Sequence, residues 1–353
     1  MKIKPQLWKV ITALTLTTSI VTAISTYPTI ADTPTSTKQI IRKFITLSGH
    51  TAPIRAIALS LDKQTLASGS DDQTIKLWNI KTGQLLRTIN AHKDRVTSVA
   101  FTPNGKILTA SDQENTIKLW NFNNGELLTT LTGHKAGIAS IAVSPDSKIL
   151  VSASEDKVIK LWNLNNNQLL RTKIAEATFL VISPDGKTLF SGSENGTIKQ
   201  WNLRTFKLQR TLIPPKPKSP PFPGQKASRV YSLAISPSGQ TLVNGGYDDS
   251  HQTIQETDQK NIKVWNLKTG KVLHNFSMGI GSADTVAISP DGKTFASGGL
   301  ASSIYLWDLK TGKLLRTLEG HAGGIYALAF TQDGKTLISG SGDKSIKVWQ
   351  LSP

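Results

Sequence analysis

Short runs of apolar and polar residues follow one another in the same order along most of the chain. The run "TIKLW" at 74–78 returns at 116–120, and as "VIKLW" at 158–162 and "SIKVW" at 345–349. A small apolar run such as "TLASG" precedes it, and a run such as "LLRTI" follows it. Short runs of this kind, bounded by Gly, Pro, Asp and Asn, predict β-strands. Four strand signals joined by turns this short predict an antiparallel meander.

The tryptophans that end these runs show how often the unit is repeated. They stand at positions 78, 120, 162, 201, 265, 307 and 349, with spacings of 42, 42, 39, 64, 42 and 42 residues. Fixed spacing of this kind indicates a repeat architecture. One such sheet has apolar residues on both faces, and sheets stacked around an axis bury both. The pattern therefore predicts an all-β fold, a seven-bladed β-propeller of four-stranded antiparallel blades.

The two ends of the repeat region supply complementary parts of one unit. The last unit stops at "WQLSP", just after Trp349, before any fourth strand. The segment "IIRKFITLSGH" at 40–50 is similar to "KLLRTLEGH" at 313–321. We therefore expect a closing strand at 40–47 to complete the last blade of a propeller that spans 40–353. Deletion of this strand should destabilise the fold far more than deletion of 26–39.

Units of about 42 residues, with Gly-His near the start and Trp near the end, resemble the WD-repeat β-propeller family. The likeness covers 40–351 and recurs seven times. Asp follows Trp only at Asp308, whereas Asn follows it in five units and Gln in the last. The resemblance implies a non-catalytic scaffold without a cofactor. It also implies that a protein or peptide partner binds on the rim around the central channel.

Four histidines precede their tryptophans by the same 28 residues: His50, His92, His134 and His321. One histidine in each unit places them on different blades, so they cannot converge on one metal ion. The resemblance implies instead a hydrogen-bonded set of His, Ser, Asp and Trp within a blade. Three units carry the full set, namely His50, Ser68, Asp72 and Trp78; His134, Ser152, Asp156 and Trp162; and His321, Ser339, Asp343 and Trp349. No nucleophile elbow or oxyanion loop accompanies these residues, so we assign no catalytic residue.

The other units depart from the set. By spacing, unit two has Ala110 and Glu114 where Ser and Asp belong. Unit four keeps Ser191 without a histidine, unit five replaces the turn, and unit six has Ala301 at the turn. We therefore expect blades four to six to form the less rigid arc of the ring.

The resemblance implies that partner contacts lie near the start of the first strand of each blade. Carried over by position, the candidates are Arg55, Arg95, Thr97, Ala139, Thr178, Arg229, Tyr231, Asp284 and Tyr326, with Asp71 and Glu155 just before the turn aspartates. Arginine and tyrosine are the side chains that most often carry binding energy at interfaces.

The first 31 residues differ from the repeats. Three lysines are followed by 22 uncharged residues at 10–31, with small-residue endings suited to cleavage. This pattern is typical of a signal peptide, and the alternative is a membrane anchor through 10–31. Residues 32–39 read as a Thr/Pro-rich linker. We expect an exported protein, either periplasmic or secreted.

The 64-residue spacing holds two insertions. A Pro-rich inter-blade loop at 213–227 predicts a stiff extended excursion, with a docking motif for a proline-reading domain as the alternative. A polar loop in blade five, at 245–261, predicts a solvated hairpin extension, and cation binding by its aspartates is the alternative.

Composition restricts the partners further. There are 41 Lys+Arg against 24 Asp+Glu, a formal net charge of +17, and no cysteine, which excludes disulfides. The charge favours an acidic partner and weak attraction to an anionic membrane or cell-wall surface. The lysines are spread through every repeat without an aromatic–basic cluster, so nucleic acid is disfavoured. The alternatives to a monomeric scaffold are an enzyme with its site over the channel and an electrostatic binder of anionic surfaces or nucleic acid.

Overall fold

The computed structural model describes residues 39–41, 44–60, 64–102, 106–111, 114–213, 229–247, 261–278 and 282–351. They belong to one compact unit, Lys38–Pro353. Within the described ranges no helix is long and apolar enough to cross a membrane. The expected signal or anchor at 1–31, most of the linker at 32–39 and nearly all of the Pro-rich loop lie outside the described residues.

Each repeat forms one antiparallel sheet. Its strands lie side by side in order from the central channel to the outside of the ring. Blade one holds β3 (Ile54–Leu59), β4 (Thr65–Ser70), β5 (Thr74–Asn79) and β6 (Leu85–Asn90). Blade two holds β7 (Val96–Phe101), β8 (Lys106–Ser111), β9 (Ile117–Asn121) and β10 (Leu127–Leu131). Blade three holds β11 (Ile138–Val143), β12 (Ile149–Ser154), β13 (Val158–Asn163) and β14 (Gln168–Ile174). Blade four holds β15 (Phe179–Ile182), β16 (Thr188–Gly192), β17 (Ile198–Asn202) and β18 (Leu208–Leu212).

The remaining repeats follow the same order. Blade five holds β19 (Arg229–Ile235), β20 (Thr241–Tyr247), β21 (Ile262–Asn266) and β22 (Lys271–Phe276). Blade six holds β23 (Thr285–Ile288), β24 (Thr294–Gly298), β25 (Ile304–Asp308) and β26 (Leu314–Leu318). Blade seven holds β27 (Ile325–Phe330), β28 (Thr336–Ser341), β29 (Ser345–Gln350) and, on its outside, β2 (Phe44–Ser48). The predicted all-β propeller of four-stranded antiparallel blades is confirmed. The expected blade-five loop begins later than 245, because β20 continues to Tyr247, and residues 248–260 lie outside the described ranges.

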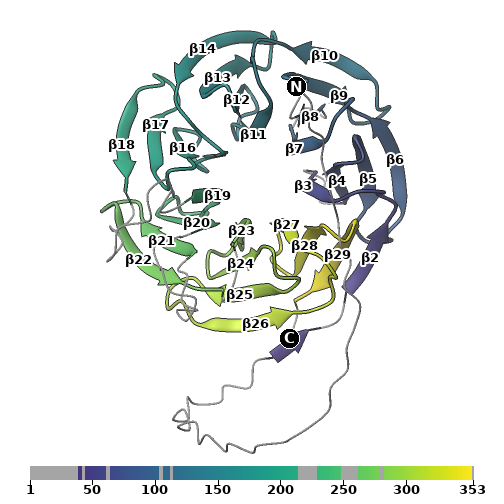
Figure 1. The fold of residues 1–353 in the computed structure, drawn as a ribbon, viewed down its shortest axis with the longest axis vertical. Coiled ribbons are helices and arrows are strands. Elements are labelled where there is room, and N and C mark those ends of the chain that lie inside the picture. The colour runs from purple at the N-terminus through teal and green to yellow at the C-terminus, as the bar shows by residue number, and fades with distance from the viewer. Residues whose placement is uncertain are drawn as a thin grey trace, which may run out of the picture. The chain divides into compact units, whose positions relative to one another are not determined.

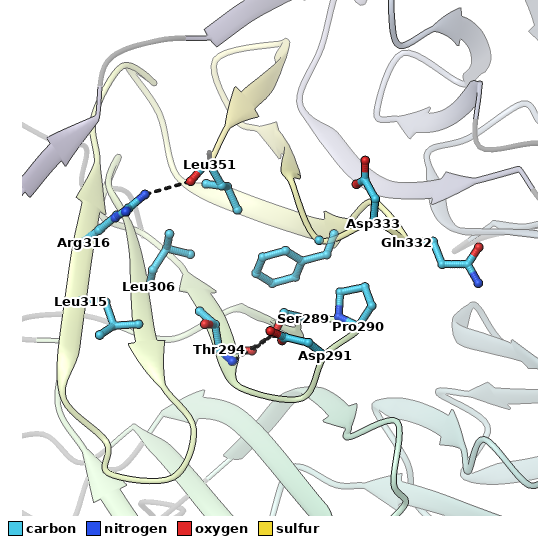
Figure 2. A pocket seen from close by; sticks show the side chains of 12 residues that line it. Ser289, Pro290, Asp291, Thr294, Leu306, Leu315, Arg316, Gln332, Asp333 and Leu351 are labelled. Carbon is cyan, nitrogen blue, oxygen red and sulfur yellow. Dashed lines mark hydrogen bonds between the residues drawn. The ribbon is translucent and has the colours of Figure 1, made fainter. Parts of the chain in front are cut away.

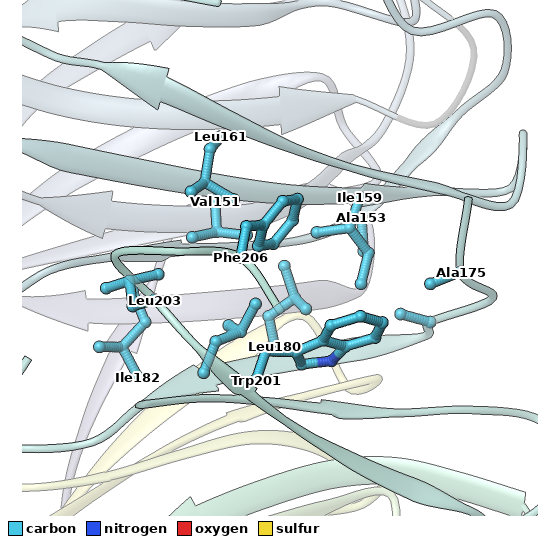
Figure 3. Close-up of a cluster of buried hydrophobic side chains, with 12 residues drawn as sticks. Val151, Ala153, Ile159, Leu161, Ala175, Leu180, Ile182, Trp201, Leu203 and Phe206 are labelled. Atoms are coloured by element: carbon cyan, nitrogen blue, oxygen red, sulfur yellow. The ribbon is translucent and has the colours of Figure 1, made fainter. Parts of the chain in front are cut away.

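The sheets stand side by side around a central axis (Figure 1). The innermost strands contact one another in the order β3, β7, β11, β15, β19, β23 and β27, and β27 also contacts β3. Among the described residues, a cluster of buried apolar side chains lies between each blade and the next. Figure 3 shows the one where Ile159 and Leu161 of blade three meet Leu180 and Trp201 of blade four. Neighbouring blades therefore bury both faces of each sheet.

Glycine at the end of the second strand lets the next blade approach closely. A Cβ atom added to Gly192 would lie 2.3 Å from a methyl carbon of Val230, on the inner strand of the next blade. Real Cβ atoms do not come so close, so a side chain here would push the blades apart. Where blade three has Ala153 instead, the next blade has the small Ala177 in the same cluster. The residue at the end of the second strand and its neighbour on the next blade are thus matched in size.

The N-terminal part of the compact unit contributes strands to two blades. β2 pairs antiparallel with β29, with Phe44 opposite Trp349 and Ser48 opposite Ser345. Leu47 is 1% exposed and packs in the cluster between blades seven and one. The bounds differ from the expected 40–47, because β1 (Gln39–Ile41) pairs parallel with β26 and forms a fifth strand on blade six. An outer strand has an open edge of backbone groups, and β1 uses that edge on β26.

Candidate partner-binding site at the channel mouth

All seven blades contribute to one hollow, with a volume of about 370 Å³, at the mouth of the central channel. Its lining consists of Arg55, Arg95, Thr97, Ala139, Thr178, Phe179, Tyr231, Asp284 and Tyr326. These residues stand at or near the start of the innermost strand of their blade. Eight of the nine are candidates from the sequence, so the structure brings most of the predicted set together.

Arg55 is held in place at this mouth. Its Nε and Nη2 atoms donate hydrogen bonds to the Asp71 carboxylate, with Nη2 2.6 Å and Nε 2.9 Å from the nearer oxygens. Its guanidinium carbon lies 4.7 Å from the ring centroid of Tyr326, within the range of a cation–π contact. The hydrogen bonds that Arg55 donates to Asp71 raise the pKa of Arg55 above its usual value. Because a third of its side chain remains exposed, Arg55 presents a fixed cation to solvent.

Asp284 brings a negative charge to the same hollow. It precedes β23 and accepts a hydrogen bond from the hydroxyl of Ser282. Burial raises the pKa of Asp284, although the Ser282 bond and the charge of Arg55 act in the opposite direction. The mouth therefore carries charges of both signs, with the aromatic rings of Phe179, Tyr231 and Tyr326 between them.

The two threonines of the hollow join neighbouring blades. The hydroxyl of Thr97 donates to the carbonyl of Ile138 at 2.7 Å, and that of Thr178 donates to the carbonyl of Val230 at 2.6 Å. In each pair the acceptor is the first or second residue of the inner strand of the next blade. These hydroxyls therefore hold the inner wall together, a role for which sequence position alone gives no signal.

Three sequence candidates lie outside the lining, and one lining residue was missed. One of the three, Asp71, accepts hydrogen bonds from the lining residue Arg55. Arg229 opens β19 and Glu155 stands in the turn before β13; both are exposed and neither lines the hollow. Phe179 does line it, directly after the candidate Thr178. The sequence did contain a signal for Phe179. It is an aromatic residue at the start of an inner strand, where most other blades have a smaller side chain.

A larger hollow of about 630 Å³ lies between turns of blades six and seven (Figure 2). At one side of it Arg316 donates to the carbonyl of Leu351 at 2.9 Å, and Asp291 accepts from the hydroxyl of Ser289 at 2.6 Å. A similar hollow lies between the corresponding turns of blades four and five, lined by Pro184 and Pro237. Because the space recurs where adjacent turns diverge, it follows from the blade geometry.

The histidines lie within their own blades. In blade one, His50 Nδ1 is 2.7 Å from the Asp72 carboxylate, and His50 Nε2 is 2.7 Å from the hydroxyl of Ser68. The indole N–H of Trp78 donates to the same hydroxyl at 2.8 Å. A neutral imidazole satisfies every bond when Nδ1–H donates to the carboxylate and Nε2 accepts from the serine. The four side chains thus form one continuous buried chain of hydrogen bonds.

Blades three and seven repeat this arrangement. His134 bonds Asp156 at 2.9 Å and Ser152 at 2.8 Å, and the corresponding distances from His321 to Asp343 and Ser339 are both 2.7 Å. Burial lowers the pKa of His134 and of His321, which favours the neutral imidazole. Burial acts to raise the pKa of Asp343, but hydrogen bonds from Ser345, the Ala322 N–H and His321 lower it to about 2.

The strand register corrects the assignment in blade two. Thr109 pairs with Lys118 there, as Ser68 pairs with Lys76 in blade one, whereas Ala110 pairs with Ile117. The position expected at Ala110 is therefore filled by Thr109. Counted between the paired residues, the connection from β8 to β9 has one residue more than its counterpart in blade one, and the connection from β7 to β8 has one fewer, so the spacing from His to Trp is unchanged.

Blade two also pairs its histidine differently. His92 Nδ1 is 2.5 Å from the Glu114 carboxylate, which also accepts from Lys118 Nζ at 2.8 Å. Burial acts to raise the pKa of Glu114, but the bonds from Lys118 and His92 lower it to about 2. The buried Nε1 of Trp120 finds no acceptor among the residues that the structure describes. In that same part of the chain, no three His, Asp or Glu side chains converge on a possible metal site.

Comparison with known proteins agrees with this architecture. The sequence model of the WD domain, G-beta repeat, matches residues 42–79, 83–121, 125–163, 172–202, 218–251, 271–308 and 312–350. A ribosome biogenesis protein BOP1 homolog of Drosophila virilis is 46% identical over 41 residues, which is 12% of this chain and 5% of that protein. Mitochondrial division protein 1 of Schizosaccharomyces pombe is 46% identical over 44 residues, which is 12% of this chain and 7% of that protein. These two relatives are thus matched over a small part of their length, about one repeat. The seven matched repeats show that the chain belongs to the WD-repeat family.

Proposed function

We propose that this chain is a non-catalytic scaffold that binds a protein or peptide partner at the channel mouth. Propellers of this family typically serve protein interactions, and the ribosome-biogenesis and mitochondrial-division names of two relatives describe those proteins only. The observation that carries the proposal is the convergence of all seven blades on one hollow. Its fixed arginine and its aromatic side chains are of the kinds that dominate interface energetics.

The charges of the mouth refine the expected partner. Arg55 is already paired with Asp71, and Asp284 stands in the same hollow, so a uniformly acidic partner is disfavoured at the centre. The exposed Arg95 offers a second cation on the rim. We therefore propose a partner that places an acidic group near Arg95 and an aromatic or aliphatic side chain between Tyr231 and Tyr326.

The test is affinity capture followed by direct titration. Wild-type protein and an Arg55→Ala/Arg95→Ala variant are used to capture partners, and each captured partner is titrated by calorimetry. The double variant should weaken binding by about tenfold or more, since truncation of interface arginines often costs more than 1 kcal/mol. Arg229→Ala is the matched control, because Arg229 is exposed but lies outside the hollow. Equal affinity of the double variant and the wild type, with the fold intact, would refute the proposal.

Export is a separate part of the proposed function. The lysines before an uncharged apolar run at 10–31 support a signal peptide or an anchor. N-terminal sequencing of the mature protein, isolated from its native cell, distinguishes the two. A start between residues 24 and 33 supports cleavage, a membrane-bound protein that retains residue 1 supports the anchor, and a full-length protein free of membrane contradicts both.

A further inference from the structure

The outer edge of β14 differs from the outer edges of the other blades. All seven residues of β14 are exposed, and Ile174 is 86% exposed. Eleven residues after the tryptophan, most blades place a buried apolar residue on the outer strand, such as Ile89 at 5% and Leu318 at 0%. Blade three has Lys173 there, paired with Ile159, and turns the following Ile174 outward. The C-terminal end of β14 is therefore exposed to solvent, whereas the corresponding residues on the outer strands of most other blades are buried.

Arg171 adds to this difference. The equivalent Arg87 donates to the carbonyls of Asn123 and Asn124 in the next blade, and Arg316 donates to that of Leu351. Among the described residues Arg171 makes no such bond, and its side chain is exposed. Residues two apart on a strand share a face, so Arg171 and Lys173 present two positive charges on the same side of the edge.

The chain itself shows what such an edge can hold. β26, with the sequence "LLRTL", pairs with β1 as a fifth strand. β14 carries the closely similar "LLRTK", and no described strand lies beyond it in its sheet. The unpaired N–H and C=O groups of an edge strand bind an extended segment by main-chain hydrogen bonds. Blade three therefore offers the kind of edge that is occupied in blade six.

We propose that the outer edge of β14 binds an extended segment of a partner protein as a fifth strand. The segment carries acidic residues two apart, opposite Arg171 and Lys173, with apolar residues between them that cover Ile174. A second copy of this strand would bring like charges together, which destabilises a strand pair. The same two charges disfavour neutral strands, so they restrict the edge to acidic segments. This surface is independent of the channel mouth.

A synthetic peptide tests the proposal with the full folded chain. The probe is a fluorescein-labelled Ac-VEVEVEV-amide, whose binding is measured by fluorescence anisotropy at low salt. One control peptide is Ac-VKVKVKV-amide, and the other is the glutamate peptide with alternate backbone nitrogens methylated. Strand addition predicts that the glutamate peptide binds about tenfold or more tightly than either control, because only it has both the charge and the free N–H groups.

Variants locate the binding. Arg171→Glu/Lys173→Glu should weaken the binding of the glutamate peptide by about tenfold or more and strengthen the binding of the lysine peptide. The reason is that the two positive charges on the edge of β14 are replaced by negative ones. Lys81→Glu/Lys310→Glu makes the same change of net charge on two exposed turns and should leave the tenfold preference in place. Arg55→Ala/Arg95→Ala should also bind the peptide like the wild type, which separates this surface from the channel mouth. Equal binding of the methylated peptide, or unchanged binding by the Arg171→Glu/Lys173→Glu variant, would overturn the proposal.

Discussion

The ring divides into two arcs that fasten their tryptophans differently. Blades seven, one, two and three form a histidine-bearing arc, in which each imidazole bonds a carboxylate of its own blade. Blades four, five and six form a second arc without this histidine–carboxylate pair, where the tryptophan N–H still reaches an acceptor in the second strand: Ser191, Asn244 or Ser297. The bond from tryptophan to the second strand thus occurs in both arcs, with blade two as the exception among the described residues, and the histidine–carboxylate pair is the addition.

The addition coincides with the place where the two ends of the propeller meet. β2 and β29 pair in blade seven, the first blade of the histidine-bearing arc. A ring joined by non-covalent strand pairing can open at its junction, and buried, fully satisfied hydrogen bonds make their surroundings rigid. The lower rigidity of blades four to six stays a prediction, which amide hydrogen exchange resolved by blade can measure.

The largest expected effect comes from the junction itself. Leu47→Ala should lower the free energy of unfolding by roughly 2–5 kcal/mol, because it leaves a cavity between blades seven and one. Ile45→Ala, on the same strand but 40% exposed, should cost less than about 1 kcal/mol. Urea unfolding followed by tryptophan fluorescence measures both. Similar small losses in the two variants would show that β2 does not hold the ring together.

A second pair of variants removes, in one blade of each arc, the serine hydroxyl that accepts the hydrogen bond from the tryptophan N–H. Ser68→Ala leaves two buried groups without a partner, His50 Nε2 and Trp78 Nε1. Ser191→Ala leaves only Trp201 Nε1. Since each unsatisfied buried group costs about 1–3 kcal/mol, the blade-one variant should lose roughly twice as much stability as the blade-four variant. Equal losses in urea unfolding would mean that the histidine contributes nothing to the network.

The sequence predicts the ring and most of the channel mouth for a physical reason. A blade interface repeats, so its Gly, Trp and apolar positions recur at a fixed spacing, and the first-strand positions then locate the mouth. The register of blade two could not be predicted in this way, because an inserted and a deleted residue cancel between His92 and Trp120. The three-residue β1 was missed as well, since backbone pairing at an edge needs no side-chain pattern.

Acid should first destabilise three blades of the histidine-bearing arc, namely seven, two and three. Burial lowers the pKa of His92, His134 and His321, so the unfolded chain binds protons more readily there and stability falls as the pH drops below about 6.5. Glu114 and Asp343, each with a pKa of about 2, add a further loss as the pH falls from about 4.5 towards 2.

Urea unfolding between pH 8 and pH 4 should therefore give a nearly constant stability above pH 7 and a decline below it. Amide exchange, corrected for its intrinsic pH dependence, should show the change in blades seven, two and three before blades four to six. Faster exchange that begins in blades four to six on acidification would contradict the role given to the histidines.

The smallest expected effect on stability concerns a single hydrogen bond, the one that a tryptophan N–H donates to the second strand. Trp78 is 1% exposed and donates to Ser68, whereas Trp120 is 8% exposed and its N–H finds no acceptor among the described residues. Trp→Phe removes a similar apolar area at both sites, so most of that cost cancels in the comparison. Trp78→Phe should be the costlier change by about 1–2 kcal/mol, because it loses a made bond while Trp120→Phe removes an unsatisfied donor. Trp201→Phe, which loses its bond to Ser191, should resemble Trp78→Phe in urea unfolding. Equal losses of stability at positions 78 and 120 would mean that the N–H of Trp120 is already satisfied. Blades one and two would then differ only in the carboxylate that pairs with the histidine.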